Sequence, residues 1–212
     1  MHSVTAIIPA FNEERTIGDV IKVLQRVNLI DKIIVVSDGS VDSTVDIAKK
    51  HEVEIVELRD NIGKGGALRK GVDASLSEIM LFVDADLIGL KEQHIIELLL
   101  PILKGEVDMT IGVFKSGRFT TDLAQRVAPY LSGQRAIKRY IIDNIPNIDI
   151  TRFGVEIALT KYVTNNNIKY KEVFLENLTH VMKEEKLGLI KGFASRLKMY
   201  WDIVKIMTTK ER

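Results

Sequence analysis

The sequence contains no cysteine among its 212 residues, which excludes disulfide bonds and thiolate metal sites and is compatible with a reducing interior. The formal net charge is only +1, so there is no overall electrostatic argument for binding nucleic acid. No stretch reaches the ~18 consecutive apolar residues that a membrane-spanning helix needs, and the first residues show no signal-peptide pattern. These absences favour a soluble, cytoplasmic protein.

Hydrophobic residues make up 46% of the chain, enough to build the core of one full α/β domain. Continuous apolar runs alternate with segments of helical periodicity, which is typical of a mainly parallel sheet with helices on both faces. The apolar runs predict strands at 4–9, 33–36, 53–58, 79–83 and 108–113. The periodic segments predict helices at 17–27 and 91–103, a helix beginning near 42, and one that follows a 61–66 loop and ends near 75.

The pattern is less regular after residue 115. Helices are expected around Leu123, Ala136 and Ile157, and a strand is expected at 169–175. One long amphipathic helix is expected from 186 to the end. Because no repeat, low-complexity region or linker divides the chain, the prediction is a single domain over 1–212.

Two carboxylates, those of Asp84 and Asp86, directly follow the predicted strand at 79–83. In an open α/β sheet, ligands bind at the carboxyl ends of the strands. Two acidic side chains there are able to hold a divalent cation and a ribose, which a nucleotide diphosphate requires. An isolated Asp-x-Asp also occurs by chance in solvated turns, so this motif needs support from elsewhere in the chain.

Polar segments also follow the three preceding strands, at 9–13, 37–40 and 63–65. Because the ends of parallel strands lie at one edge of a sheet, these segments should meet the two carboxylates there. Each segment alone has a simpler explanation: Asn12 as a helix cap, 37–40 as an ordinary turn, and the glycines as a flexible loop that lacks the P-loop pattern. Their joint placement favours a nucleotide site, with Lys64 and backbone amides available for phosphate.

As a set, the segments PAFNEE, VVSDGSVDST, NIGKGGAL and FVDADL resemble the nucleotide-sugar-binding half of family 2-type glycosyltransferases, which have the Rossmann-like GT-A fold. The resemblance implies a UDP-sugar donor and Mg²⁺ or Mn²⁺ as cofactor. It places Asp86 on the metal, Asp84 on the ribose side of the donor, and Lys64 near the base or phosphates. The remaining residues that it implies for the nucleotide-sugar pocket are Pro9, Ala10, Asn12, Glu13, Ser37, Asp38 and Ala85.

One position departs from this family. Its members usually have two adjacent acids before Gly-Ser, whereas this chain has Ser37 and Asp38. The serine hydroxyl is able to accept a hydrogen bond from a base, so a nucleotide pocket still fits, but the identity of the base is less firmly implied.

The second half of the chain lacks the Glu-Asp pair and the Gln-x-x-Arg-Trp motif that inverting members typically carry. The order of its motifs, from 117–120 through 131–135 and 153–157 to 179–180, resembles the glucosyl-3-phosphoglycerate synthases and related retaining GT-A enzymes. This resemblance implies that Glu156 holds sugar hydroxyls near the anomeric carbon and that His180 is the second metal ligand. It further implies a sugar pocket lined by Ser132 and Gly133, and an anionic acceptor group bound by Arg118 and Thr120.

Another departure concerns the acceptor. Two residues after the metal histidine, those synthases generally have a polar residue that helps to bind the acceptor carboxylate, and here the position holds Met182. A thioether cannot hydrogen-bond a carboxylate in that way, so the acceptor is expected to differ.

Without the resemblance, the residue types alone do not decide the roles of His180, Glu156 and Arg118. His180 is the best-placed of the four histidines to partner an aspartate on a metal, and the alternative is a surface histidine in a turn. Glu156 lies in the apolar stretch 153–159, where it is either buried for a purpose or faces outward from an amphipathic helix. Arg118 suits an anion, or is a solvated loop arginine.

The predicted C-terminal helix has one aromatic and aliphatic face, with lysines largely opposite. Such a helix is able to lie on an anionic membrane surface, to pack on the domain, or to form a homodimer interface. The apolar face consists of Ile190, Phe193, Leu197, Tyr200, Trp201 and Val204, and the lysines are Lys191, Lys198 and Lys205. Membrane contact would favour a lipid phosphate as the acceptor and a membrane-associated location.

The predicted domain therefore has a nucleotide-sugar-binding half at 1–115, an acceptor- and sugar-binding part at 116–185, and the C-terminal helix at 186–212. The favoured function is transfer of a hexose, with glucose first, from a UDP-sugar to a small phosphorylated acceptor. The alternatives are transfer to a polyprenyl or dolichyl phosphate at the membrane surface, and a non-catalytic nucleotide-sugar-binding protein. A sugar nucleotidyltransferase is disfavoured, because PAFNEE is not the glycine- and arginine-rich loop that such enzymes have after the first strand.

Overall fold

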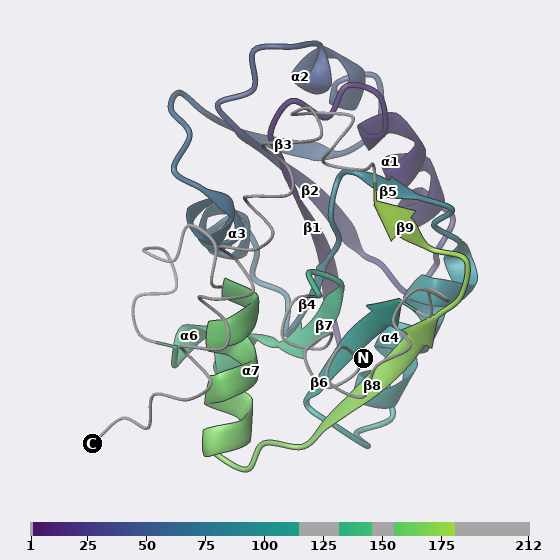
Figure 1. Cartoon of the computed structure of the whole chain (residues 1–212), viewed down its shortest axis with the longest axis vertical. Coiled ribbons are helices and arrows are strands. Elements are labelled where there is room, and N and C mark those ends of the chain that lie inside the picture. Colours follow the sequence, from purple (N-terminus) through teal and green to yellow (C-terminus); the bar gives the residue numbers. More distant parts are fainter. Residues whose placement is uncertain (1, 115–131, 146–154, 181–212) are drawn as a thin grey trace, which may run out of the picture. The chain divides into compact units, whose positions relative to one another are not determined.

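The structure is a computed structural model that describes residues 2–114, 132–145 and 155–180, and strands alternate with helices through its first part (Figure 1). The chain divides into two units after Thr179, and the fold below is that of the first unit. The strands are β1 (Val4–Ala10), β2 (Lys32–Asp38), β3 (Glu54–Leu58), β4 (Ile79–Phe82), β5 (Leu87–Ile88), β6 (Met109–Phe114), β7 (Arg135–Lys138), β8 (Tyr170–Leu175) and β9 (Thr179–His180). The helices are α1 (Ile17–Gln25), α2 (Thr44–Ala48), α3 (Lys64–Asp73), α4 (Glu92–Leu103), α6 (Arg139–Asp143) and α7 (Val155–Asn165).

Seven strands form the main sheet, in the order β3-β2-β1-β4-β7-β6-β8. Neighbours pair in parallel except at β7, which runs antiparallel to both β4 and β6. A second sheet of two strands consists of β5 and β9. The expected mainly parallel sheet is confirmed.

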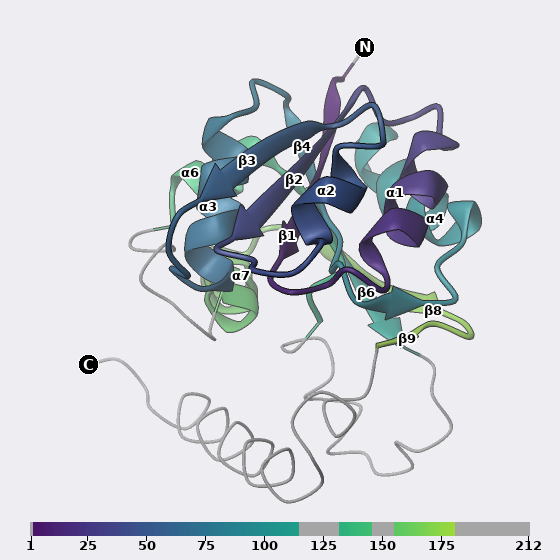
Figure 2. The ribbon, with the colours of Figure 1, turned by 90° about the horizontal axis from the view of Figure 1, so that it is seen from above.

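Helices cover both faces of the main sheet, and so give three layers. Side chains alternate along β1, so that Ala6 and Ile8 pack with α1 and α4, whereas Ile7 packs on the other face with α3, α6 and α7. Figures 1 and 2 show α1 and α4 on one side of the sheet and α3, α6 and α7 on the other. Each face is therefore a separate hydrophobic core, which explains why the strands are continuous apolar runs.

Some of the predicted elements are corrected by the structure. Ala136 belongs to strand β7 and not to a helix, because it lies between two strands and is fully buried, and a short apolar run cannot be assigned by periodicity alone. Lys64 begins α3 instead of lying in a loop. Asn12 is not the cap of α1, which begins at Ile17 after Thr16. The helix near Ile157 is confirmed as α7. The segment around Leu123 and the helix from 186 lie outside the described residues.

The antiparallel direction of β7 brings its first residues to the carboxyl end of β4. Phe82 pairs with Arg135 in this register, so the residues just before Arg135 lie beside those just after Phe82. Polar residues from two distant parts of the chain, 132–134 and 84–86, therefore meet at one edge of the sheet.

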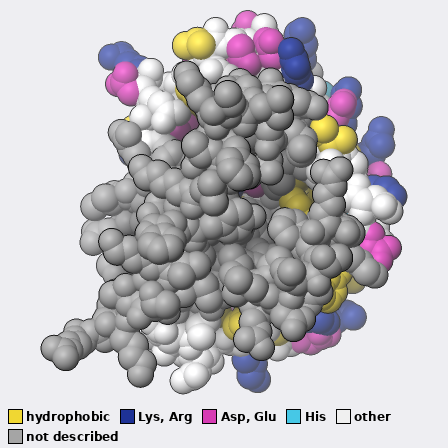
Figure 3. All heavy atoms as spheres, viewed as in Figure 1, with side chains coloured by type: hydrophobic (Ala, Val, Ile, Leu, Met, Phe, Trp, Pro, Cys, Tyr) yellow, Lys and Arg dark blue, Asp and Glu magenta, His cyan; other side chains and the backbone are white. Residues whose placement is uncertain are grey.

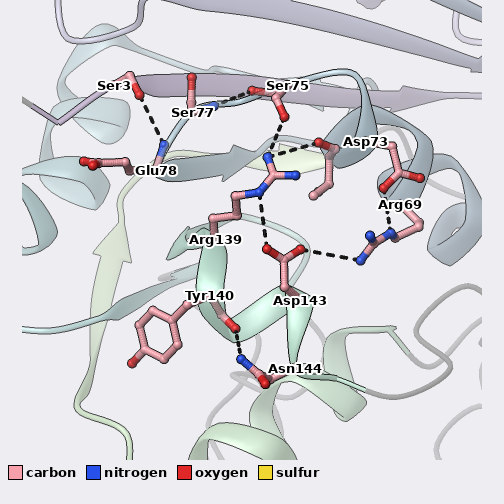
Figure 4. A network of polar contacts seen from close by, with 11 residues as sticks. Ser3, Arg69, Asp73, Ser75, Ser77, Glu78, Arg139, Tyr140, Asp143 and Asn144 are labelled. Atoms are coloured by element: carbon pink, nitrogen blue, oxygen red, sulfur yellow. Dashed lines mark hydrogen bonds and ion pairs between the residues drawn. The ribbon is translucent and has the colours of Figure 1, made fainter.

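At the opposite edge of the sheet, Arg139 of α6 binds the C-terminal end of α3 (Figure 4). Its guanidinium donates hydrogen bonds to the carbonyl oxygens of Val72 (3.3 Å) and Ser75 (2.5 Å), and its Nε lies 3.3 Å from Asp143. Asp143 also lies 3.7 Å from Arg69 of α3. Cationic side chains commonly satisfy the free carbonyls of a helix end in this way, so α3 is held firmly with respect to β7 and α6.

The described surface carries charges of both signs. In Figure 3 the basic and acidic side chains of the described residues are interspersed along the visible rim, with no broad area of one sign among them. None of the helices in the described part of the chain combines the length and the apolarity that a membrane crossing needs.

Candidate active site

The loops that follow β1 and β2 are hydrogen-bonded to each other. The backbone N–H of Val41 donates to Asn12 Oδ1 (2.9 Å), and the N–H of Asn12 donates to Ser40 Oγ (3.2 Å). The N–H of Glu13 donates to Thr44 Oγ1 (2.8 Å). Asn12 has a φ of 57°, a left-handed conformation that asparagine adopts more readily than most residues. The structure therefore brings together the two loops that carry most of the residues predicted for the nucleotide-sugar pocket.

Asp38 ends β2 and organises the loop before α3. Its carboxylate is buried and accepts hydrogen bonds from the backbone N–H groups of Ile62 (2.8 Å) and Gly63 (2.9 Å). Its neighbour Ser37 is buried as well. Because both oxygens of Asp38 receive a backbone hydrogen bond, the carboxylate positions the start of α3, and with it Lys64.

Three charged side chains form the centre of the site. Lys64 Nζ, at the start of α3, lies 2.6 Å from Asp84 Oδ1 and 2.6 Å from Glu156 Oε1. The lysine side chain is 29% exposed, that of Asp84 15% and that of Glu156 14%, so the cluster is largely but not fully buried. Burial alone would lower the pKa of Lys64, but the charges of Asp84 and Glu156 and their hydrogen bonds outweigh it and raise that pKa above its ordinary value. Lys64 is therefore a permanent cation shared by two carboxylates.

Gln134 holds Asp84 from the side of β7. The backbone N–H of Asp84 donates to Gln134 Oε1 (3.0 Å), and Gln134 Nε2 donates to Asp84 Oδ2 (2.8 Å). Gly133 precedes it, and a Cβ there would clash with Lys64 Nζ and lie only 2.5 Å from Asp84 Oδ2. A side chain at 133 would therefore displace Lys64 or Asp84 from the charged cluster.

Arg135 is a fully buried arginine on the next position of β7. Its Nε donates to the carbonyl oxygen of Ser132 (2.9 Å), and its NH1 donates to Thr160 Oγ1 (2.8 Å). Thr160 in turn donates to the carbonyl oxygen of Glu156 (2.9 Å). Burial lowers the pKa of Arg135 to about 10 against the opposing effect of the carboxylates of Glu156 and Asp84, so the guanidinium stays charged at neutral pH. Arg135 connects the 132–134 segment to α7.

The predicted metal ligand Asp86 lies in the turn between β4 and β5, at the same edge of the sheet. No group of three or more potential metal-binding side chains gathers anywhere in the described ranges. A Mg²⁺ ion that also binds a diphosphate needs only one or two protein carboxylates, so Asp86 still fits such an ion.

The segment that leads to His180 runs beside β5. A Cβ on Gly89 would lie 2.5 Å from the carbonyl oxygen of Asn177, and His94 of α4 is hydrogen-bonded to the backbone of Glu176. The side chain of His180 lies outside the described residues, and its role as a metal ligand stays a prediction.

The other predicted residues are located as follows. Pro9 and Ala10 form the end of β1, and Ala85 is buried between the two acids. Gly133 lies against Lys64 and Asp84, and the carbonyl oxygen of Ser132 accepts a hydrogen bond from Arg135. Their place in a sugar pocket stays a prediction. The predicted acceptor residues Arg118 and Thr120 lie outside the described residues.

The comparison with protein families decides where the chain belongs, since residues 5–163 match Glycosyl transferase family 2. The chain is a member of this family. It is 34% identical over 191 residues to the glucosyl-3-phosphoglycerate synthase of Mycolicibacterium smegmatis, covering 74% of this chain and 62% of that protein. It is 39% identical over 98 residues to a dolichyl-phosphate beta-glucosyltransferase of Drosophila melanogaster, covering 39% of this chain and 30% of that protein. The chain thus spans less than two thirds of the length of both relatives.

Among solved structures, the family 2 chain is similar to glucosyl-3-phosphoglycerate synthase from Mycobacterium tuberculosis. The crystal structure of that enzyme with Mn²⁺, UDP-glucose and phosphoglyceric acid has a TM-score of 0.72 and 28% identity, covering 85% of this chain and 72% of that one. The same enzyme has been crystallised with Mg²⁺ and UDP. The predicted GT-A fold is confirmed by this similarity and by the family.

Sequence reasoning assigned no role to Gln134, Arg135 or Thr160. A signal was present for one of them: Arg135 directly precedes the apolar pair at 136–137, where a charged side chain is unusual unless it has partners. The partners are far away in sequence, so neither they nor the direction of β7 could be derived from local patterns.

Proposed function

We propose that this family 2 chain transfers a hexose, with glucose the favoured sugar, from a UDP-sugar to a small phosphorylated acceptor. The observation that carries the proposal is the cluster of Lys64, Asp84 and Glu156, which stands at the carboxyl edge of the sheet. Ligands of open α/β sheets bind at that edge. The names of the similar synthases and their complexes with UDP-glucose support the choice of donor.

In this proposal, the tied loops after β1 and β2 receive the uracil and the ribose. Asn12, Ser37 and the adjoining residues present hydrogen-bonding groups to the base, and Asp84 accepts a hydrogen bond from a ribose hydroxyl. Lys64 contributes a positive charge beside the place of the diphosphate. The hydrogen bonds that already hold these groups reduce the ordering that donor binding requires.

A divalent cation, Mg²⁺ or Mn²⁺, would bind to Asp86 and, as predicted, to His180. When bound, such an ion neutralises negative charge that develops on the diphosphate as it leaves. Crystals of the similar synthase contain Mn²⁺ with UDP-glucose in one case and Mg²⁺ with UDP in another.

The transfer step would place the sugar over Glu156, whose carboxylate orients hydroxyl groups near the anomeric carbon. The bond from the anomeric carbon to the diphosphate breaks, and a bond to the acceptor oxygen forms. The acceptor hydroxyl gives its proton to the leaving phosphate if the sugar keeps its configuration, as the resemblance to retaining enzymes implies. Arg118 and Thr120 would bind the anionic group of the acceptor.

The test is calorimetric titration with UDP-glucose and other UDP-hexoses in Mn²⁺ buffer, followed by transfer assays with 3-phosphoglycerate and glycerol 3-phosphate. We expect UDP-glucose to bind most tightly among the donors and a phosphorylated acceptor to be glucosylated. Absence of UDP binding with Mn²⁺ present would rule the proposal out. Tight binding without turnover on any acceptor would instead support a non-catalytic nucleotide-sugar-binding protein.

A second candidate is transfer to a polyprenyl or dolichyl phosphate. It is favoured by the similarity to the dolichyl-phosphate beta-glucosyltransferase, which is confined to a part of the chain. Vesicles that contain polyprenyl phosphate provide the assay. Glucose transfer to these vesicles, with none to the small phosphorylated acids, would replace the first candidate with the second. Location in the cytoplasm, membrane contact and homodimer formation remain predictions.

A further inference from the structure

Gln134 has a buried side-chain amide that hydrogen-bonds to one residue of the site, Asp84. It is 1% exposed, and its two side-chain polar atoms both bond to Asp84, one to the backbone N–H and one to the carboxylate. The orientation of the amide follows from its partners. If it were turned over, the amide oxygen would face a carboxylate oxygen and the amide nitrogen would face an N–H group, so both contacts would be repulsive.

The two bonds restrict Asp84 in a way that Lys64 cannot. Lys64 reaches Asp84 with a long flexible side chain and shares its charge with Glu156. Gln134 hydrogen-bonds to both the backbone N–H and the carboxylate of Asp84, and therefore limits the rotation of the Asp84 side chain. Its own backbone is held as well, since its N–H donates to Ser132 Oγ (3.2 Å) and its carbonyl oxygen accepts from the N–H of Gly112 (2.8 Å).

We infer that Gln134 is a positioning residue for donor binding, which presets the carboxylate of Asp84 for a hydroxyl of the bound nucleotide sugar. The inference rests on the proposed function. A carboxylate that is already held in its binding orientation loses less freedom when the ligand binds, and so binds more tightly. Gln134 itself stays behind Asp84 and needs no contact with the donor.

The test uses Gln134→Met, which keeps the length of the side chain but removes both hydrogen bonds. We expect UDP to bind about tenfold more weakly in Mn²⁺ buffer, since a hydrogen bond to a charged group is lost. We also expect the KM for UDP-glucose to rise by a similar factor, while the KM for the acceptor stays the same. A general loss of folded protein would lower the rate without changing either KM.

Thr110→Val is the matched control. Thr110 is fully buried in β6, and its hydroxyl donates to the carbonyl oxygen of Leu98 (2.7 Å), away from the charged cluster. This variant loses a buried hydrogen bond between β6 and α4 and should bind UDP like the unmodified chain. Equal losses of UDP affinity in both variants, or none in Gln134→Met, would overturn the inference. If Gln134→Met does not fold, Gln134→Asn serves in its place, because its amide is too short to make both bonds.

A failure of the proposed function is recognised separately, because the unmodified chain then binds no UDP. In that case NMR of the Gln134 side-chain amide decides whether the residue is coupled to Asp84. We expect both amide proton resonances to shift in Asp84→Asn. Unchanged resonances would show that Gln134 does not hold Asp84, whatever the ligand of the site.

Discussion

At the scale of single residues, the site is a cluster in which opposite charges are balanced before any ligand arrives. Lys64 neutralises part of the charge of Asp84 and Glu156, and Arg135 adds a second, fully buried cation nearby. Removing one member of a buried ion pair leaves an uncompensated charge, which costs more than the pair itself contributes. The stability of the fold and the chemistry of the site are therefore linked at these positions.

Lys64→Met is expected to destabilise the chain by about 2 kcal/mol, because two carboxylates then face each other without a cation. The double variant Lys64→Met with Glu156→Gln should regain part of this loss. Lys70→Met, at an exposed position of the same helix, is the control and should unfold like the unmodified chain. Urea denaturation measures all of them, and equal stability of Lys64→Met and the control would contradict the balance of charges described above.

Asp86→Ala is expected to abolish the Mn²⁺-dependent part of UDP binding, because the carboxylate proposed to hold the ion is gone. Calorimetric titrations with UDP, in the presence and absence of Mn²⁺, measure this part directly. Asp19→Ala removes a carboxylate that is 81% exposed on α1, and should leave the metal dependence intact. Unchanged metal dependence in Asp86→Ala would exclude Asp86 as a metal ligand.

At the scale of elements, α3 carries Lys64 at its first residue and must lie close to the sheet. Gly71 makes this possible, because a Cβ there would clash with Ile7 Cγ2 of β1 and lie 3.1 Å from Val36 Cγ2 of β2. The far end of the helix is held by Arg139 (Figure 4). The position of Lys64 thus depends on contacts along the whole helix.

Gly71→Ala is expected to destabilise the chain by about 1–3 kcal/mol, although alanine is the better helix former, because overpacking outweighs helix propensity here. We also expect weaker UDP binding, since α3 must shift to admit the methyl group. Chemical denaturation and calorimetry give the two values. Combining Gly71→Ala with Ile7→Ala should cost less than the sum of the single changes, and strict additivity would show that the two side chains do not meet.

At the scale of the whole molecule, His94 links the start of α4 to the segment before β9. The N–H of Lys91 donates to His94 Nδ1 (3.2 Å), so the ring proton is on Nε2. Burial lowers the pKa of His94, with Lys91 acting in the same direction and the backbone of Glu176 and the charge of Glu97 acting against it. The folded chain therefore favours the neutral ring.

The sign of the pH effect follows from this shift. As the pH falls through the ordinary value of 6.5, the unfolded chain takes up a proton before the folded chain does, and stability decreases until the pH passes the folded pKa. Thermal unfolding between pH 7.5 and 5 should show a loss of stability that is smaller in His94→Gln, where no proton can bind. The same pH dependence in the unmodified chain and in His94→Gln would show that His94 does not contribute to the pH dependence of stability.

The sequence by itself determined the alternating strands and helices of the first part of the chain, and the edge of the sheet at which the acids lie. Continuous apolar runs such as 79–83, alternating with segments of helical periodicity, are typical of the buried strands of a covered sheet, and the acids Asp84 and Asp86 that follow then lie at its carboxyl edge. Both conclusions depend on residues that are close together along the chain, where local patterns carry the information.

Only the tertiary structure decided which side chains share the charged cluster. Glu156 was equally compatible with a solvated helix face, and Gln134 and Arg135 had no assigned role. Their places depend on the antiparallel insertion of β7 between β4 and β6 and on the packing of α7, which put Gln134 against Asp84 and Glu156 against Lys64. Pairing between distant segments is set by the burial of the whole core. The periodicity of a single segment therefore does not predict which segment it pairs with.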